Sequence, residues 1–236
     1  MIGPTLPGRR TNQNLEPAMP SLMTCEQVEI AVAADERVVG HLVVPASATG
    51  VVVFAHGSGS SRHSRRNRRV AAALNERRLA TLLMDLLTER EDAIDQRTRQ
   101  MRFDVGLLAQ RLLLAASMLA ERIDTGNLPV GYFGASTGGG AALVAARREP
   151  DRVRAVVSRG GRPDLAADDL PAVLAPTLLI VGGRDPVVLD LNRRALDLMR
   201  CERRLDVVPG ATHLFEEPDA LTKVGELASE WFVKHL

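Results

Sequence analysis

Aromatic residues are scarce in this chain, and Phe, Trp and Tyr together make up 3% of its 236 residues. So few rings argue against an aromatic-lined pocket and against a stacking platform for single-stranded nucleic acid. Net charge is nearly absent as well, at +1. A near-neutral chain gives no reason to expect nucleic acid or an anionic membrane as its partner.

Cysteine is the next shortage, with only Cys25 and Cys201 present. The two lie far apart and form no metal-ligand spacing, so we expect two free thiols in a reducing cytoplasm, with no metal and no cofactor. No apolar run approaches the roughly 18 residues that a membrane-spanning helix needs. Residues 1–24 carry Pro, Gly and polar residues without the apolar segment of a secretory signal. We expect a disordered tail there and a single domain over residues 25–236.

Predicted strands and predicted helices alternate along the rest of the chain. Strands are predicted at Val28–Ala33, Arg37–Pro45, Val51–Ala55, Leu79–Leu86, Val130–Phe133, Ala155–Ser158, Thr177–Gly183 and Arg204–Pro209. Helices are predicted at Arg65–Glu76, Phe103–Ile123, from just after residue 136 to near Pro150, at Val187–Met199 and at Asp219–Lys234, with a charged loop over Glu89–Gln100. This alternation predicts an α/β fold, a mostly parallel twisted sheet of about eight strands with helices on both faces, opened by an antiparallel hairpin.

One short motif lies where a predicted strand meets a predicted helix. Gly134-Ala135-Ser136-Thr137-Gly138 fits the pattern G-x-S-x-G. A serine on such a sharp turn has its hydroxyl lifted clear of the sheet, beside the backbone N–H groups of a helix N-terminus. We predict that Ser136 is a nucleophile. A phosphate loop is the rival interpretation of these glycines, and it fails because no G-K-[ST] follows.

A carboxylate and an imidazole follow the serine in chain order. Asp185 comes directly after the Thr177–Gly183 strand, and His213 follows the last strand. The order Ser, Asp, His is that of α/β-hydrolases. A serine hydroxyl needs a base within hydrogen-bond reach, and histidine titrates near neutral pH. Asp185 would orient the imidazole, although Asp164 and Asp85 also follow strands and stay alternative acids.

Acyl transfer also needs N–H donors for the developing oxyanion. One is expected from Thr137, the residue after the nucleophile. The second is expected from the loop that follows Val51–Ala55, with the N–H of Ser58 first and that of Gly59 behind it. His56 in the same loop is interpreted as a structural residue that hydrogen-bonds within the loop.

Basic residues concentrate in RHSRRNRR, from Arg62 to Arg69. We interpret this run as a solvated helix face rather than a nucleic-acid site, with Arg62 able to reach the mouth of the pocket. Arg159 follows the Ala155–Ser158 strand on the same side of the sheet. Its guanidinium would either hold a substrate carboxylate in bidentate fashion or pair with Asp164.

Five segments together resemble the α/β-hydrolase superfamily, and within it the small dienelactone hydrolase-like proteins. They are FAHGSGSSRHS, GYFGASTGGGAAL, SRGGRPDLA, GGRDPVV and GATHLFEEP. The resemblance implies Ser136 as nucleophile, Asp185 as acid, His213 as base, and oxyanion donors at Thr137 and in the Ser58 region. The short segment between Ala155–Ser158 and Pro176 leaves no room for a large cap domain.

One residue departs from the family's pattern, because dienelactone hydrolases proper use a cysteine where this chain has Ser136. We therefore expect a cytoplasmic serine hydrolase of small carboxylic esters or lactones, and no sequence signal indicates a homo-oligomer. Other acyl transfer on the same triad, by a thioesterase, peptidase or acyltransferase, stays an alternative. A non-catalytic binding protein of the same fold is a further one.

Overall fold

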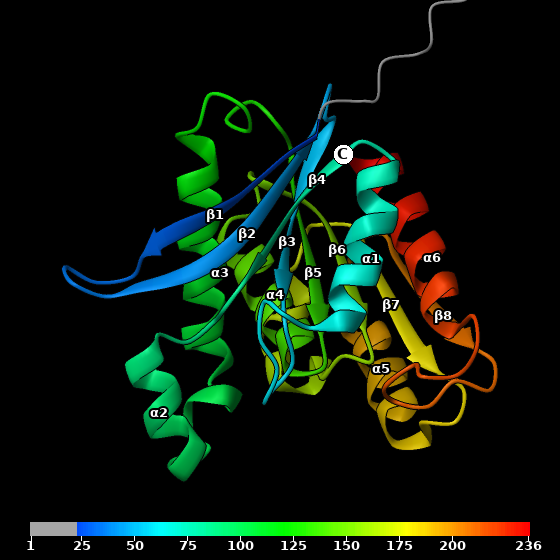
Figure 1. Cartoon of the computed structure of the whole chain (residues 1–236). Coiled ribbons are helices and arrows are strands. Elements are labelled where there is room, and N and C mark those ends of the chain that lie inside the picture. Colours follow the sequence, from blue (N-terminus) through cyan, green and yellow to red (C-terminus); the bar gives the residue numbers. More distant parts are fainter. Residues whose placement is uncertain (1–22) are drawn as a thin grey trace, which may run out of the picture.

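The computed structural model describes residues 23–236, and eight strands form one sheet within it (Figure 1). The strands are β1 (Met23–Ala31), β2 (Arg37–Pro45), β3 (Gly50–Ala55), β4 (Leu79–Met84), β5 (Val130–Ala135), β6 (Val153–Arg159), β7 (Thr177–Gly182) and β8 (Arg203–Val208). Their order across the sheet is β1-β2-β4-β3-β5-β6-β7-β8. β1 and β2 pair antiparallel, as do β2 and β4, and the other neighbours are parallel. The predicted sheet and its opening hairpin are confirmed.

Helices cover both faces of this sheet (Figure 1). α1 (Arg65–Glu76) and α6 (Ala220–His235) share one apolar core with the sheet, while α3 (Val105–Ala120), α4 (Thr137–Arg148) and α5 (Pro186–Leu198) share the other. The central strands β3, β4, β5 and β7 are buried along their whole length. Runs of Val, Leu and Ile suit such strands, because helices exclude water from both of their faces.

The segment predicted as a charged loop, Glu89–Gln100, is in fact a helix, α2 (Glu89–Thr98). Thr88 accepts a hydrogen bond from the N–H of Glu91, and the Glu91 side chain accepts one from the N–H of Thr88. This capping box stabilises the first turn. The expectation failed because α2 buries only Asp95 and therefore lacks the apolar stripe by which surface helices are predicted.

Other boundaries differ by a few residues. β1 begins at Met23, five positions before the predicted start at Val28, so the last two residues of the predicted tail lie in a strand. The rest of that tail, residues 1–22, lies outside the described residues. α3 is shorter than the predicted Phe103–Ile123, because the carboxylate of Asp104 caps it by accepting the N–H of Leu107.

Three short 3₁₀ helices, η1 (Met101–Phe103), η2 (Pro163–Ala166) and η3 (Leu170–Ala172), complete the elements described. No cap domain is inserted between β6 and β7, as predicted. Among residues 23–236, no helix is long and apolar enough to cross a membrane. Cys25 and Cys201 are both free thiols.

Candidate active site

Ser136 occupies the turn between β5 and α4, with φ 52° and ψ −121°. A non-glycine residue in such a conformation costs about 1–3 kcal/mol, so surrounding contacts have to hold it there. The N–H of Ser136 donates to the carbonyl of Arg159 at 3.2 Å, and its own carbonyl accepts from Gly139 at 2.9 Å and Arg162 at 3.0 Å. These bonds fix the strained turn from both sides.

Two glycines let the strand and helix approach each other around this turn. A Cβ atom at Gly134 would lie 2.5 Å from the Cα of Gly139, and one at Gly138 would lie 2.7 Å from the carbonyl oxygen of His56. Real Cβ atoms do not come this close to backbone. The G-x-S-x-G glycines are therefore required by packing, and the helix start is pressed against the ends of β3 and β5.

Asp185 and His213 come together at the neighbouring strand ends. Asp185 follows β7 and precedes Pro186 at the start of α5, yet its side chain makes no hydrogen bond to that helix. Instead its Oδ2 lies 2.7 Å from Nδ1 of His213. Of the two alternative acids, Asp164 is bound by Arg162 at 2.7 and 2.8 Å, and Asp85 pairs with Arg62. The structure thus places Asp185, rather than Asp164, against the imidazole.

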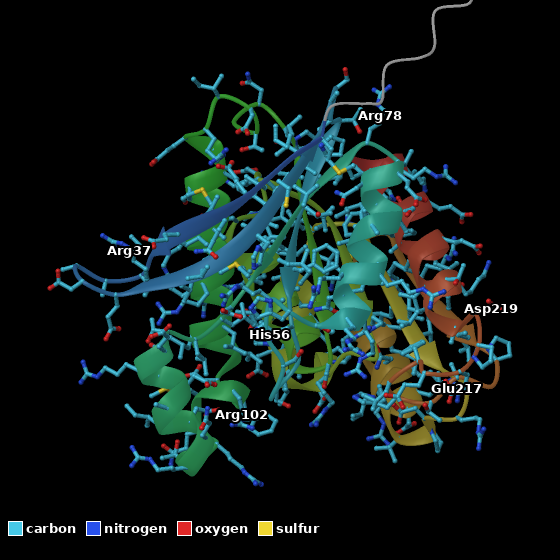
Figure 2. The ribbon with its side chains drawn as sticks, in the orientation of Figure 1. Arg37, His56, Arg78, Arg102, Glu217 and Asp219 are labelled. Carbon is cyan, nitrogen blue, oxygen red and sulfur yellow. The ribbon has the colours of Figure 1, made fainter. Side chains whose placement is uncertain are left out.

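His213 lies in the loop after β8, and contacts of the neighbouring Thr212 fix the position of this loop. The carboxylate of Glu217 accepts the N–H of Thr212 at 3.0 Å, and Figure 2 shows Glu217 in this loop ahead of α6. A Cβ at Gly182 would lie 2.7 Å from the carbonyl oxygen of Thr212, so the loop packs directly on the end of β7. The imidazole itself lies beside Gly160, where a Cβ would be 3.5 Å from its Nδ1.

Ser136 and His213 line one cavity of about 270 Å³. The side chain of His213 is 40% exposed while that of Asp185 is 14% exposed, so the imidazole faces the cavity and the carboxylate lies behind it. Nδ1 is occupied by Asp185, which leaves Nε2 as the ring nitrogen available to a proton from the cavity. Sequence position alone predicted that these three residues share one edge of the sheet.

The two predicted oxyanion donors lie together, although one is already occupied. Thr137 is the first residue of α4, so its N–H has no carbonyl partner within the helix. The N–H of Ser58 donates to Oγ1 of Thr137 at 3.0 Å. This bond ties the loop to the helix N-terminus. It also means that the Ser58 N–H would have to turn away from Thr137, or be shared, to reach an oxyanion.

His56 is held inside the loop, as expected of a structural residue. Its Nδ1 lies 2.9 Å from the carbonyl oxygen of Gly57, and its Nε2 accepts the N–H of Leu86 at 3.3 Å. Burial lowers the pKa of His56 below its ordinary value. A neutral imidazole with a proton on Nδ1 satisfies both bonds. Figure 2 shows the residue at the end of β3.

Two residues predicted near the pocket lie elsewhere. Arg62 forms an ion pair with Asp85, and its Nε lies 3.3 Å from Nε2 of His41. Gly59, with φ 71°, lines a second cavity of about 180 Å³, which Arg102 also lines. Among the described residues that line the cavity of Ser136, neither Arg62 nor Gly59 is present.

Several residues that the sequence analysis did not single out line the cavity of Ser136, among them Gly57, Arg66 and Asn67. Gly57 packs over the serine, since a Cβ there would lie 3.0 Å from Cβ of Ser136. Arg66 and Asn67, in the first turn of α1, also face it. The basic run is therefore not wholly a solvated face. The only available signal was that α1 begins directly after the loop, which points its first turn at the strand ends.

Comparison with known proteins connects this geometry to a family. The sequence profile of the dienelactone hydrolase family matches residues 38–231. This chain belongs to the dienelactone hydrolase family. A crystal structure of dienelactone hydrolase from Anabaena variabilis is 58% identical to it, with a TM-score of 0.88 over 91% of this chain and 99% of that one. The family assignment and the α/β-hydrolase fold without a large cap are thus established.

Two further proteins are similar to this chain, one in its fold and one in its sequence. Est1E from Butyrivibrio proteoclasticus has a TM-score of 0.74 at 16% identity, over 88% of this chain and 98% of its own, and shows the shared fold. A curated Mycobacterium tuberculosis protein named "putative phosphoribosyl transferase" is 60% identical over 211 residues, which are 89% of this chain and 46% of that protein. The chain thus spans about half the length of this curated relative.

Proposed function

We propose that this member of the family is a serine hydrolase of small carboxylic esters or lactones. The observation that carries the proposal is the contact between Asp185 and His213 beside a strained Ser136 that lines the same cavity. The transferase name belongs to a relative about twice as long, and the proposal concerns the part that it shares with this chain.

The reaction begins with removal of the serine proton. Nε2 of His213 accepts the proton of the Ser136 hydroxyl while Oγ forms a bond to the ester carbonyl carbon. Asp185 keeps the proton on Nδ1 and stabilises the imidazolium that results. The carbonyl oxygen becomes an oxyanion, which accepts hydrogen bonds from the N–H of Thr137 and from that of Ser58 once it leaves Oγ1 of Thr137.

The second half returns the proton and frees the enzyme. The imidazolium of His213 protonates the leaving alkoxide as the C–O bond breaks, which leaves an acyl group on Ser136. A water molecule then gives its proton to His213 and attacks the acyl carbon. Collapse of that intermediate releases the carboxylic acid and restores the serine hydroxyl. No redox step or additional co-reactant is needed.

Hydrolysis of para-nitrophenyl esters with different acyl-chain lengths, and of simple lactones, tests this function. We expect Ser136→Ala and His213→Ala to lower kcat by roughly four or more orders of magnitude. Ser158→Ala is the matched control, because Ser158 is a fully buried serine on β6, paired with Gly134 of β5. It should keep the wild-type rate. Equal rates for Ser136→Ala and wild type would disprove the proposed function.

A further inference from the structure

Asn192 is a fully buried polar residue of α5, and its side chain bonds outside that helix. Its Nδ2 donates to the carbonyl oxygen of Gly161 at 3.0 Å and to that of Val188 at 2.8 Å. Only the NH2 end of an amide can donate, so these two carbonyls fix its orientation. Among residues 23–236, its Oδ1 then has no hydrogen-bond partner. Burying an unsatisfied oxygen costs stability, so this amide requires an explanation other than packing.

The bond from Asn192 to Gly161 connects two elements of the candidate site. One is α5, which begins directly after Asp185, and the carbonyl of Asp185 accepts the N–H of Leu189 at 2.9 Å in the first turn of this helix. The other is the segment of residues 160–162 that follows β6, which we call the β6 loop. The amide of Asn192 therefore holds the start of α5, and the carboxylate that precedes it, against the β6 loop.

The end of β6 and the β6 loop contact both the serine and the imidazole. The N–H of Ser136 donates to the carbonyl of Arg159, the last residue of β6, whose side chain lines the same cavity. The N–H of Arg162 donates to the carbonyl of Ser136 at 3.0 Å. At Gly160, which has φ 51°, a Cβ would lie 3.5 Å from Nδ1 of His213. The β6 loop thus fixes the strained serine turn and borders the imidazole.

Close packing transmits the position of the β6 loop to the serine turn. A Cβ at Gly161 would lie 1.8 Å from Oγ of Ser158, and a Cβ at Gly139 would lie 2.4 Å from the same atom. Gly139 lies in the first turn of α4, and its N–H donates to the carbonyl of Ser136 at 2.9 Å. Because no gap separates the loop from β6 and the start of α4, a shift of the loop has to displace the turn as well.

We propose that Asn192 is a positioning residue, whose amide bridge from α5 to the β6 loop holds Ser136, Asp185 and His213 in the alignment that proton transfer needs. Within the described part of the chain, Asn192 does not line the cavity of Ser136, so it acts through the β6 loop and α5. The inference rests on the proposed function, since alignment matters only if the three residues react together. A displacement of about 1 Å at the reacting atoms lowers a rate roughly 100-fold.

Two substitutions of Asn192 test the inference in hydrolysis of para-nitrophenyl esters. Asn192→Leu keeps the branched shape of the side chain and removes its donors. Asn192→Ser keeps a hydroxyl that can bond to the carbonyl of Val188 within the helix, but that is too short to reach Gly161. We expect both to lower kcat roughly 100-fold and to leave KM nearly unchanged, because alignment is lost while the surface of the cavity stays. Fluorophosphonate labelling of Ser136 should slow by a similar factor.

Asn75→Leu is the matched control, because Asn75 also bridges a helix and a strand. Its Nδ2 donates to the carbonyl oxygen of Leu79 at 2.9 Å and to Oγ1 of Thr81 at 3.1 Å. Leu79 is the first residue of β4, so this bridge lies at the edge of the sheet opposite Ser136. We expect Asn75→Leu and Asn192→Leu both to unfold at lower urea concentrations than wild type. Only Asn192→Leu should lose kcat.

The failure of this inference differs from failure of the proposed function. Wild-type kcat in a folded Asn192→Leu, or in Asn192→Ser if the leucine variant does not fold, would overturn the inference alone. Equal losses of kcat in the Asn75 and Asn192 variants would overturn it too, because activity would then follow stability. A raised KM with unchanged kcat would make Asn192 a support of the binding surface instead. If wild type cleaves no ester or lactone, the hydrolase function fails, and this inference fails with it.

Discussion

Replacing Gly134 by alanine should disrupt the turn that carries Ser136. The new Cβ would lie 2.5 Å from the Cα of Gly139 and closer still to the carbonyl oxygen of Gly138. Unstrained contacts between carbon atoms are about 3.5–4.0 Å, so the start of α4 has to move by about 1 Å. Overpacking of this kind typically costs about 1–3 kcal/mol. Because both obstacles are backbone atoms that cannot rotate away, we expect the upper end, about 3 kcal/mol.

Urea unfolding and ester hydrolysis measure this effect together. A loss of about 3 kcal/mol is a large part of the roughly 5–15 kcal/mol that stabilises a typical domain. Gly40→Ala is the control, since its Cβ would meet the Cδ1 of Leu82 at 2.7 Å, the far end of a side chain. It should cost less, about 1 kcal/mol, and keep kcat. If Gly134→Ala unfolds at the wild-type urea concentration and keeps full kcat, the packing argument is wrong.

The remaining predictions concern the acid and the buried imidazole. Asp185→Asn should lower kcat by roughly 10⁴-fold, because the amide no longer fixes the tautomer, whereas Asp164→Asn should change it little; the reverse result in ester hydrolysis would exchange their roles. The lowered pKa of His56 means that below pH 6.5 the unfolded chain binds a proton that the folded chain does not. The unfolding free energy should therefore fall as pH falls from 6.5 towards the folded pKa, by up to about 1.4 kcal/mol per pH unit for this residue. His56→Asn should flatten that slope in urea titrations at several pH values, while His41 and His235, whose pKa values are also lowered, contribute to both proteins. An equal slope in the two proteins would contradict the prediction.

Much of the candidate site could be predicted from the sequence, because its residues come directly or shortly after predicted strands. Ser136, Asp185 and His213 each follow a strand of the sheet, and parallel strands bring their carboxyl ends to one edge of the sheet. The structural role of His56 could also be predicted, because the residue directly follows a buried strand and begins a tight glycine loop.

Other features depended on contacts that a sequence does not contain. α2 has no apolar stripe by which it could be predicted. Thr88 and Glu91 form a capping box, and that pattern is the sequence signal that marks the start of this helix. Whether the N–H of Ser58 donates to Oγ1 of Thr137 or to an oxyanion depends on how the loop packs against the start of α4, and the sequence does not contain that information. Among residues 23–236, Nε and Nη1 of Arg159 have no hydrogen-bond partner, and Asp164 binds Arg162, two residues away in the sequence, instead.

Covalent labelling of the folded chain with a fluorophosphonate, followed by mass spectrometry of its peptides, tests most directly whether Ser136 is an activated nucleophile. We predict one adduct, on Ser136, that is absent in Ser136→Ala and forms much more slowly in His213→Ala. An adduct on another residue, or no adduct on the wild-type protein, would contradict the proposed serine chemistry.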